Sequence, residues 1–490
     1  MYYIGIDLGT SAVKMILVDE EGRILHATVR EYPIQMPFPG WSQQRPEDWR
    51  EAVIAGISEL VKNVDRSKVA GIGVSGQMHG LVALDEADRV IRPAILWNDG
   101  RSEKETEWLN HAVGKERLSS LTGNIAFAGF TAPKLLWMYA NEKELFERIR
   151  HILLPKDYIV HLLSGEYSTD YSDASGTLLL DVQNKRWSQE MMQICHVYRE
   201  QMPTLHESFE TVGRLTSSMA ERLGLPQSVR ICAGAGDNAA AAIGTGTVGD
   251  AQCNISLGTS GTVFISSESF VSVPNNALHA FAHADGCFHL LGCMLSAASC
   301  NKWWMEQILH SHSFAAEQAG IVDDMLGNNA TYFLPYLMGE RSPHNDAAAK
   351  GCFIGLSMRS ARLDMTQAVF EGVAFAIRDS LEIARDRGIV PKQSRICGGG
   401  AKSPLWRKIM SNVINLPLML PAQEEGPSMG SAILASVACG QYGSVREAVG
   451  RIVKMTGSEE PSAEIAQRYE QKYQTFKKLY PALKERFKEL

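Results

Sequence analysis

The chain has 490 residues, with 48 Lys and Arg against 55 Asp and Glu, which gives a formal net charge of −7 at pH 7. This balance excludes a strong basic field, and with it nucleic-acid binding and wholesale attachment to anionic membranes. Because 45% of the residues are hydrophobic, large buried cores can form and disorder is excluded as the main state. At roughly 150 residues per domain, the length predicts about three domains or two large α/β domains.

Cysteine usage and the amino terminus predict a cytoplasmic protein without a membrane partner. The nine cysteines are an odd number and include no C-x-x-C pair, which indicates reduced thiols rather than a disulfide framework. Residues 1–22 lack the basic start and long apolar run of a signal peptide. No uncharged stretch approaches the ~18 residues that a membrane span requires.

The first predicted element is a β-hairpin over Ile4–Asp19, in which an apolar strand, a Leu-Gly-Thr-Ser turn and a β-branched strand follow one another. The same pattern returns near the middle of the chain, over Asn254–Ser267. Internal repetition of this kind indicates duplicated structural units. The two hairpins therefore predict two similar domains that face each other.

The other predicted elements alternate between helices and strands. A helix begins at Pro46, where two acidic residues open a segment with one apolar face. Short apolar strands are predicted at Val69–Gly76, Ala94–Asp99 and His151–Tyr158. A long helix is predicted behind a capping box at Asp364 and Gln367 and ends at Gly388, and a charged amphipathic helix is predicted over 468–490. The alternation predicts an α/β fold.

The two glycine turns are candidate phosphate sites. In the first, Asp7 precedes a turn whose backbone N–H groups and hydroxyls suit phosphate oxygens, while the carboxylate suits a hydrated Mg²⁺. An ordinary hairpin is the alternative for either copy alone, but the repetition favours a functional pair. The candidate phosphate-binding residues are Gly9, Thr10 and Ser11 in the first turn and Gly258, Thr259 and Ser260 in the second.

Asp237 is the candidate general base. It follows a strand end made of small residues and precedes an alanine-rich helix within Ile231–Gly246. A helix N-cap is the alternative reading, because Asp is common at that position. The crowded glycines and the position at the carboxyl end of a strand favour catalysis, with Asn238 holding a neighbouring hydroxyl.

Triple glycine at 398–400 follows a strand that begins at Ser394 and precedes a helix start near Trp406. Bare backbone of this kind lets a flat base or a ribose lie against it, although a tight strand-to-helix turn is an equal alternative. No G-x-x-x-x-G-K-[ST] and no G-x-G-x-x-G spacing occurs, so P-loop and Rossmann mechanisms are excluded.

A candidate sugar site lies at SGQMHG, where Met78 and His79 combine a soft apolar surface with a polar tip. Trp97 adds a stacking face, and Asp99 and Arg101 add hydrogen-bonding groups. The alternatives are a buried core histidine at His79 and a structural ion pair between Asp99 and Arg101. No His/Cys/Asp cluster has the spacing of a zinc site.

With these motifs in order, the chain resembles the FGGY family of carbohydrate kinases, within the superfamily of sugar kinases, actin and heat-shock ATPases. The resemblance covers nearly the whole length through IGIDLGTSAVK, SGQMHG, RPAILWNDGR, GFTAPKLLW, LLPKDY, SDASGT, GDNAAAA, SLGTSG, LSAASC, FLPYLMGERSPHND, GGGAKSPLWR and GPSMGSA. It implies two actin-like, ribonuclease H-like domains that flank a deep cleft. Residues 1–246 would hold the sugar and the catalytic base, and residues 247–490 would hold ATP.

The resemblance also implies roles for single residues. Asp237 would be the proton acceptor, and Asp7 would be the second catalytic carboxylate and the ligand near Mg²⁺. The substrate would contact Met78, His79, Trp97, Asp237 and Asn238. The nucleotide would contact Gly9, Thr10, Ser11, Lys14, Gly258, Thr259, Ser260, Gly399, Gly400 and Ser403, with Trp303 or Trp304 beside the adenine. Ala12 replaces a glycine found in many relatives, which narrows the first turn slightly.

The implied reaction is ATP-dependent phosphorylation of a small sugar, with D-xylulose as the expected acceptor and D-xylulose 5-phosphate as the product. Another ketose or polyol, such as ribulose, gluconate, erythritol or glycerol, is the first alternative, because the phosphate machinery is shared and sugar contacts are few. A nucleotide-gated interaction protein of the actin or chaperone type is the second. A homodimer is the expected assembly.

Overall fold

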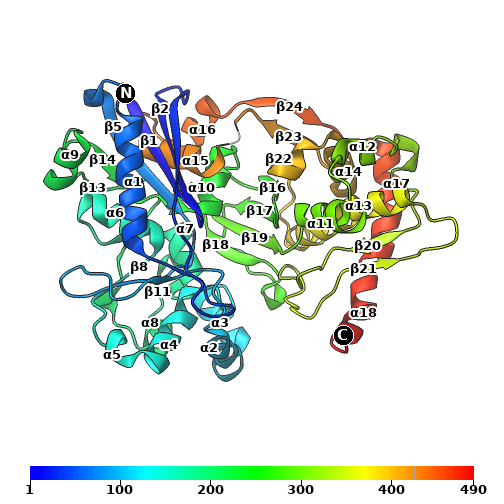
Figure 1. Cartoon of the computed structure of the whole chain (residues 1–490), viewed down its shortest axis with the longest axis horizontal. Coiled ribbons are helices and arrows are strands. Elements are labelled where there is room, and N and C mark those ends of the chain that lie inside the picture. Colours follow the sequence, from blue (N-terminus) through cyan, green and yellow to red (C-terminus); the bar gives the residue numbers. More distant parts are fainter. Residues whose placement is uncertain (424) are drawn as a thin grey trace.

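The computed structural model describes residues 1–423 and 425–490, which form two lobes that each contain a seven-stranded sheet (Figure 1). In the first lobe the strand order is β13-β14-β5-β1-β2-β3, with β15 beside β5. These strands are β1 (Tyr2–Leu8), β2 (Ala12–Asp19), β3 (Ile24–Glu31), β5 (Val69–Gly76), β13 (Thr211–Arg214), β14 (Arg230–Cys232) and β15 (Ala235–Gly236).

The second sheet has the order β18-β19-β17-β16-β22-β23-β24. Its strands are β16 (Cys253–Leu257), β17 (Gly261–Ser267), β18 (His279–Ala282), β19 (Phe288–Met294), β22 (Ser394–Cys397), β23 (Leu418–Pro421) and β24 (Met455–Glu459). From β3 to β13, successive strand pairs run antiparallel, antiparallel, parallel, parallel and antiparallel. From β19 to β24 the same five directions follow. The sheets are therefore copies of one topology, with β18 as an extra edge strand.

Two-stranded ribbons complete the strands of the described residues. They pair β4 (Gln43–Gln44) with β7 (Ala94–Ile95), β6 (Val82–Leu84) with β8 (His151–Leu153), β9 (Ser168–Asp170) with β12 (Thr204–His206), β10 (Leu180–Asp181) with β11 (Arg186–Trp187), and β20 (Tyr332–Leu334) with β21 (Cys352–Ile354).

The helices surround and separate the two sheets. Those of the first half are α1 (Pro46–Leu60), α2 (Glu103–Trp108), α3 (Lys115–Thr122), α4 (Thr131–Asn141), α5 (Lys143–Phe146), α6 (Pro155–Ser164), α7 (Tyr171–Ala174), α8 (Gln189–Ile194), α9 (Ser217–Leu223) and α10 (Asp237–Gly244). Those of the second half are α11 (Ala298–Trp303), α12 (Phe314–Gln318), α13 (Arg362–Arg385), α14 (Pro404–Ile414), α15 (Gly426–Ala438), α16 (Val445–Ile452), α17 (Ala463–Phe476) and α18 (Leu479–Phe487).

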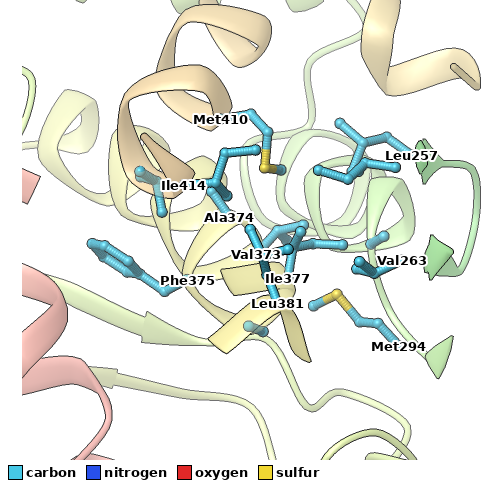
Figure 2. Close-up of a cluster of buried hydrophobic side chains, with 14 of the residues drawn as sticks. Leu257, Val263, Met294, Val373, Ala374, Phe375, Ile377, Leu381, Met410 and Ile414 are labelled. Carbon is cyan, nitrogen blue, oxygen red and sulfur yellow. The ribbon is translucent and has the colours of Figure 1, made fainter. Parts of the chain in front are cut away.

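Each sheet has its own hydrophobic core. Ile4 and Ile6 of β1 pack with Trp49 and Val53 of α1, because one face of α1 is apolar and lies against the strands. The core of the second lobe is built on the buried helix α13. Figure 2 shows part of this core, where side chains of α13 pack between strand residues such as Leu257 and helix α14.

A helix from the second half of the chain covers the opposite face of the first sheet. Side chains alternate along a strand, so Gly5 points away from the core of Ile4 and Ile6 and toward α15. Helix α15 packs on β1 and β5 and also against α10, between the two lobes (Figure 1). A Cβ at Gly430 of α15 would overlap the carbonyl oxygen of Ala240 in α10. The lobes are thus joined by helices whose backbones touch.

The α/β class and the pair of similar sheets predicted from the repeated hairpins are confirmed. The predicted strand His151–Tyr158 is wrong after Leu153, because Pro155 begins α6 and Asp157 accepts a hydrogen bond from the N–H of Leu154. The strand at Ala94–Asp99 likewise ends at Ile95.

Two helix predictions also need correction. The long helix begins before the predicted capping pair, since Asp364 already lies in its first turn and accepts from the N–H of Ala361. Gln367 lies inside that helix, and its amide donates to the carbonyl of Met325. The amphipathic carboxyl-terminal segment is divided into α17 and α18 rather than forming one helix.

The contact between α10 and α15 yields a stability prediction. Gly430→Ala should destabilise the chain by about 1–3 kcal/mol, because the added methyl group forces the two helix backbones apart. Gly450→Ala is the matched control, since a Cβ at that position of α16 meets nothing within 4 Å. The control should be neutral or gain up to about 1 kcal/mol from helix propensity. Thermal unfolding of both variants measures the difference, and equal midpoints would contradict the packing described here.

Candidate active site

Two carboxylates face each other where the lobes meet. Asp7 is near the end of β1, beside Ser75 of β5, whose hydroxyl donates to Oδ1 of Asp7 at 3.3 Å. Asp237 is the first residue of α10, and its Oδ1 accepts the N–H and the side-chain amide of Asn238 at 2.7 and 2.9 Å. The N-cap of α10 is Gly236, so the alternative reading of Asp237 as an N-cap is wrong.

Burial raises the pKa of both carboxylates, and repulsion adds to the shift of Asp7. Burial raises the pKa of Asp7 to about 7, and the negative charge of Asp237 adds to the effect. Burial also raises the pKa of Asp237 to about 6, although the hydrogen bonds from Asn238 oppose the shift. A carboxylate with such a pKa is matched to general base catalysis near neutral pH.

The first glycine turn presents its N–H groups rather than its carbonyl groups. The carbonyl of Gly9 accepts from the hydroxyl of Tyr32 at 2.5 Å, and the carbonyl of Thr10 accepts from the amide of Gln44 at 2.7 Å. The N–H groups of Thr10 and Ser11 have no hydrogen-bond partner in the part of the chain that the structure describes. Such a turn suits an anion.

The second turn repeats this arrangement. The carbonyl of Gly258 accepts from the N–H of Ala298 at 2.8 Å, and that of Thr259 accepts from Ala297 at 3.0 Å. The N–H groups of Thr259 and Ser260 are unpaired among residues 1–423 and 425–490. Both predicted phosphate turns therefore offer free donors, and the side chains of Thr259 and Ser260 are exposed.

Lys14 forms an ion pair across the lobes. It lies opposite Asp7 in the β1–β2 ladder, and its Nζ is 2.5 Å from a carboxylate oxygen of Glu425, the N-cap residue of α15. Its charge also lowers the pKa of Asp7, against the larger effect of burial. Lys14 is thus beside the carboxylate pair, where a phosphate group would compete with Glu425 for it.

Of the predicted sugar residues, Met78 packs against Gly236, the residue before Asp237, and His79 packs against Gly176. Met78 is buried, and its side chain fills the space that a Cβ at Gly236 would need, one residue before the carboxylate. His79 has a positive φ of 71° and stacks on Phe130 with 4.7 Å between ring centroids. A Cβ at Gly176 would overlap the His79 ring, so a glycine is required there.

His79 is a neutral imidazole in this setting. Burial lowers its pKa to about 3, and the charge of Lys134 adds to the effect. Its Nδ1 is 2.8 Å from the carbonyl oxygen of Gly176, which can only accept, so Nδ1 carries the proton. Nε2 is then left as a hydrogen-bond acceptor, as a substrate hydroxyl requires. The alternative of a core histidine with both nitrogens satisfied is not supported.

Trp97 and the Asp99–Arg101 pair have different surroundings. The indole of Trp97 is 42% exposed and donates to the hydroxyl of Thr10 at 3.0 Å, which connects the sugar side with the first turn. Asp99 and Arg101 form a fully buried ion pair at 2.8 Å, and Arg101 also stacks over Trp41. The structural reading of Asp99 and Arg101 is therefore confirmed.

A cavity of about 540 Å³ brings four predicted nucleotide residues together. Thr259, Gly399, Gly400 and Ser403 line it, and the space beside Gly399 is open, since a Cβ there would meet nothing within 4 Å. Phe314, Ala298 and Pro404 supply apolar surface, while Asn301, Gln318 and Ser403 supply polar groups. A second cavity of about 540 Å³ adjoins Gly399 and extends to Gly426 of α15.

Trp303 does not line either of these cavities. Its ring lies parallel to that of Phe333, 6.1 Å between centroids, and packs against the core of the second lobe. Trp304 is buried and donates to the hydroxyl of Thr366. The flat apolar surface in the cavity comes instead from Phe314, a residue that the sequence reasoning did not single out.

Sequence reasoning also missed residues that reach the sugar side from other segments. Arg341 lies over Phe127, 5.4 Å from the ring centroid, and its charge lowers the pKa of His79. The buried Glu340 accepts from the N–H groups of Leu295 and Arg341. The segment GERSP carries these residues, and its mixed charges within an apolar region were the available signal.

The donor set at Asp7 fits a hard cation. Mg²⁺ takes one or two carboxylates, waters and phosphate oxygens as ligands. Asp7 has no basic side chain within ion-pair distance among the described residues, and Asp237 adds a second negative charge nearby. No group of three or more His, Cys, Asp or Glu in that part of the chain could hold a metal ion alone. The site therefore fits a cation that arrives with phosphate groups.

Comparisons with known proteins agree with this geometry. The models of the N-terminal and C-terminal domains of the FGGY family of carbohydrate kinases match residues 2–244 and 253–439. The xylulose kinase of Escherichia coli K12 is 41% identical over 98% of this chain and 99% of its own length, and that of Bacillus subtilis is 35% identical over 99% and 97%.

Solved structures give the same result. A xylulose kinase of Brucella ovis has a TM-score of 0.94 at 40% identity and covers 99% of this chain and 100% of its own. A gluconate kinase of Lactobacillus acidophilus has a TM-score of 0.93 at 26% identity, covering 98% of both chains.

The chain belongs to the FGGY family of carbohydrate kinases, as the sequence motifs predicted. It is a sugar kinase with two actin-like domains, so the predicted fold is confirmed. Within the described residues, no helix has both the length and the apolar character needed to span a membrane.

The raised pKa values of the carboxylate pair predict the pH dependence of the reaction. Asp237 can accept a proton only when ionised, and burial raises its pKa to about 6, so activity should fall as pH decreases through 6–7. If the base had the pKa of an ordinary carboxylate, activity would fall only near pH ~4. The measurement is kcat/KM for the sugar from pH 5 to 9, with free Mg²⁺ and ATP held constant. A constant kcat/KM down to pH ~5 would contradict the assignment.

Proposed function

We propose that the chain transfers the γ-phosphoryl group of ATP to the terminal hydroxyl of D-xylulose and forms D-xylulose 5-phosphate. The observation that carries this proposal is that one chain combines Asp237, whose pKa is raised to about 6, with the neutral His79 and two turns that have free N–H groups. A base, an acceptor for sugar hydroxyls and two anion sites are the groups that phosphoryl transfer to an alcohol needs.

Asp237 accepts the proton of the attacking hydroxyl. Its Oδ1 is engaged by Asn238, which leaves Oδ2 directed to the substrate. Met78 supports the carboxylate through Gly236, and Nε2 of His79 accepts a second hydroxyl and so orients the sugar. Correct orientation of two bound reactants supplies a large share of the rate in such reactions.

ATP binds chiefly to the second lobe. The cavity lined by Thr259, Gly399, Gly400 and Ser403 accepts the nucleoside, and Phe314 contacts the base. The N–H groups of both turns and Lys14 donate to phosphate oxygens and stabilise the charge of the transferred group. This assignment gives residues 1–246 the sugar and residues 247–490 the nucleotide.

Asp7 would hold Mg²⁺, a cation that also takes waters and phosphate oxygens as ligands. When bound, the ion supplies positive charge that offsets the charge on the phosphoryl oxygens. The same positive charge would reduce the electrostatic repulsion between the ionised carboxylates of Asp7 and Asp237. The hydroxyl of Ser75, which donates to Oδ1 of Asp7, would orient this carboxylate toward the ion.

The choice of D-xylulose rests on the relatives, since xylulose kinases at 35–41% identity match nearly the full length. The similarity to a gluconate kinase of Lactobacillus acidophilus keeps another sugar as the alternative. A nucleotide-gated interaction protein is disfavoured, because both domain models of the FGGY family of carbohydrate kinases match the chain. The cytoplasmic location and the homodimer stay predictions from sequence.

A panel of sugars tests the substrate. Production of ADP should rise strongly with D-xylulose and only weakly with ribulose, gluconate, erythritol or glycerol, because the relatives that match nearly the full chain are xylulose kinases. A coupled ADP assay measures each rate at equal sugar concentration, with a sugar-free control. A larger rate with another member of the panel would replace the substrate, and no stimulation by any would remove the kinase proposal.

Asp237→Asn tests the base. The amide keeps the size of the carboxylate but cannot accept the proton, so kcat should fall by about 10²–10⁴-fold. Binding of D-xylulose, measured by calorimetry, should change by less than about tenfold, since the substitution removes little contact area. A variant that retains near-native kcat would show that another group takes the proton.

A further inference from the structure

A buried cluster of four charged residues lies directly behind Asp237. Lys156 lies in the first turn of α6. Its Nζ is 2.6 Å from Asp157, 3.0 Å from Asp170 and 3.8 Å from Asp173. Their side chains are at most 1% exposed. The motifs LLPKDY and SDASGT contain three of them, and nothing in the proposed reaction uses any.

The cluster and its neighbours hold the segment that leads to Asp237 at three points. Nζ of Lys156 donates to the carbonyl of Ala233 at 3.2 Å, and the N–H of Gly234 donates to the carbonyl of Ser208 at 3.0 Å. The N–H of Gly236, one residue before Asp237, donates to the hydroxyl of Ser172 at 3.1 Å.

Asp170 connects these contacts. Its Oδ2 accepts the hydroxyls of Ser172 and Ser208 at 2.5 and 2.7 Å, and its Oδ1 lies 3.0 Å from Nζ of Lys156. Gly234 has a φ of +77°, and a Cβ there would overlap the carbonyl oxygen of Val74. The segment 233–236 is therefore tightly confined by one buried carboxylate and its partners.

Stability alone does not account for this cluster. Buried ion pairs stabilise a fold weakly, and well-packed apolar side chains often do as well or better. Both carboxylate oxygens of Asp173 lack a hydrogen-bond partner within the described chain. A burial cost of this kind, adjacent to a reacting group, is typical of functional positioning.

We propose that Asp170, Ser172 and Lys156 form a positioning network that fixes the segment 233–236 and thereby aims the carboxylate of Asp237 at the sugar hydroxyl. The proposal rests on the proposed function of Asp237 as the base. These three residues touch neither sugar nor nucleotide and act only through the backbone before α10. Their loss should therefore lower kcat and leave KM nearly unchanged, since misplacement by about 1 Å can cost 10²-fold.

Ser172→Ala tests the network with little loss of buried volume. It removes the hydroxyl that joins Asp170 to the N–H of Gly236, and kcat should fall by about 10- to 100-fold with KM values within about threefold. Ser266→Ala is the matched control. Ser266 is also a buried serine that accepts a backbone N–H, from Gln252, and donates to a carbonyl, that of Gly249, but it lies in the second sheet. The kcat of Ser266→Ala should stay within about twofold of that of the unaltered chain, and its thermal midpoint should be similar to that of Ser172→Ala.

Two further measurements separate positioning from general destabilisation. Hydrogen exchange of the amides at 234–238 should quicken in Ser172→Ala and not in Ser266→Ala. The acid limb of kcat should also move to lower pH in Ser172→Ala, because a less confined Asp237 is better hydrated. The titratable groups that face Asp237 are Asp7 on β1, Asp173 on α7 and Cys293 on β19, and none is altered.

The outcomes distinguish the network from the function. Faster exchange with unchanged kcat, or equal losses of kcat in both variants, would overturn the positioning proposal. Unchanged exchange in Ser172→Ala would overturn it as well, whatever sugar is used. Failure of the proposed function is a separate result. In that case no sugar of the panel increases ADP production by the unaltered chain.

Discussion

The burial of two neighbouring carboxylates, Asp7 and Asp237, is the constraint on which the rest of the site depends. Two carboxylates that share a buried region cannot both stay ionised cheaply. Burial raises the pKa of Asp7 to about 7, and the negative charge of Asp237 adds to the rise. Protonation of one carboxylate, or a cation bound beside the pair, removes this repulsion. The least favourable state of the site is therefore the one in which both carboxylates are ionised and no cation is bound.

The duplicated sheets explain why these groups meet. In each lobe the turn after the first strand leaves N–H groups free and ties its carbonyls to neighbouring segments, through Tyr32 and Gln44 in one lobe and through residues 297 and 298 in the other. The copies share a strand order, and in each the turn follows the first strand of the hairpin. The two copies differ in the groups that they present. The first carries the carboxylate of Asp7 in its first strand, and the second has open space beside Gly399.

Much of this could be predicted from sequence because its signals are local. The hairpins follow from glycine turns between β-branched strands, and Asp237 follows from its position between small residues and an alanine-rich helix. What could not be predicted depends on contacts between distant segments. Nothing near Lys14 indicates Glu425, and the doubled tryptophan gives no sign that Trp303 packs against Phe333. The strand expected at His151–Tyr158 failed because a proline at the first helical position outweighed the apolar pattern.

The path of α15 has a consequence for the evolution of such chains. Glycines at 5 and 73 of the first sheet and at 244 of α10 receive this helix, which belongs to the second half of the chain. Dividing the gene between its two repeats would therefore strip one repeat of a covering layer and leave an apolar sheet face in water. The first repeat therefore depends on the second for part of its packing, and this dependence prevents the two repeats from being separated again without loss of stability.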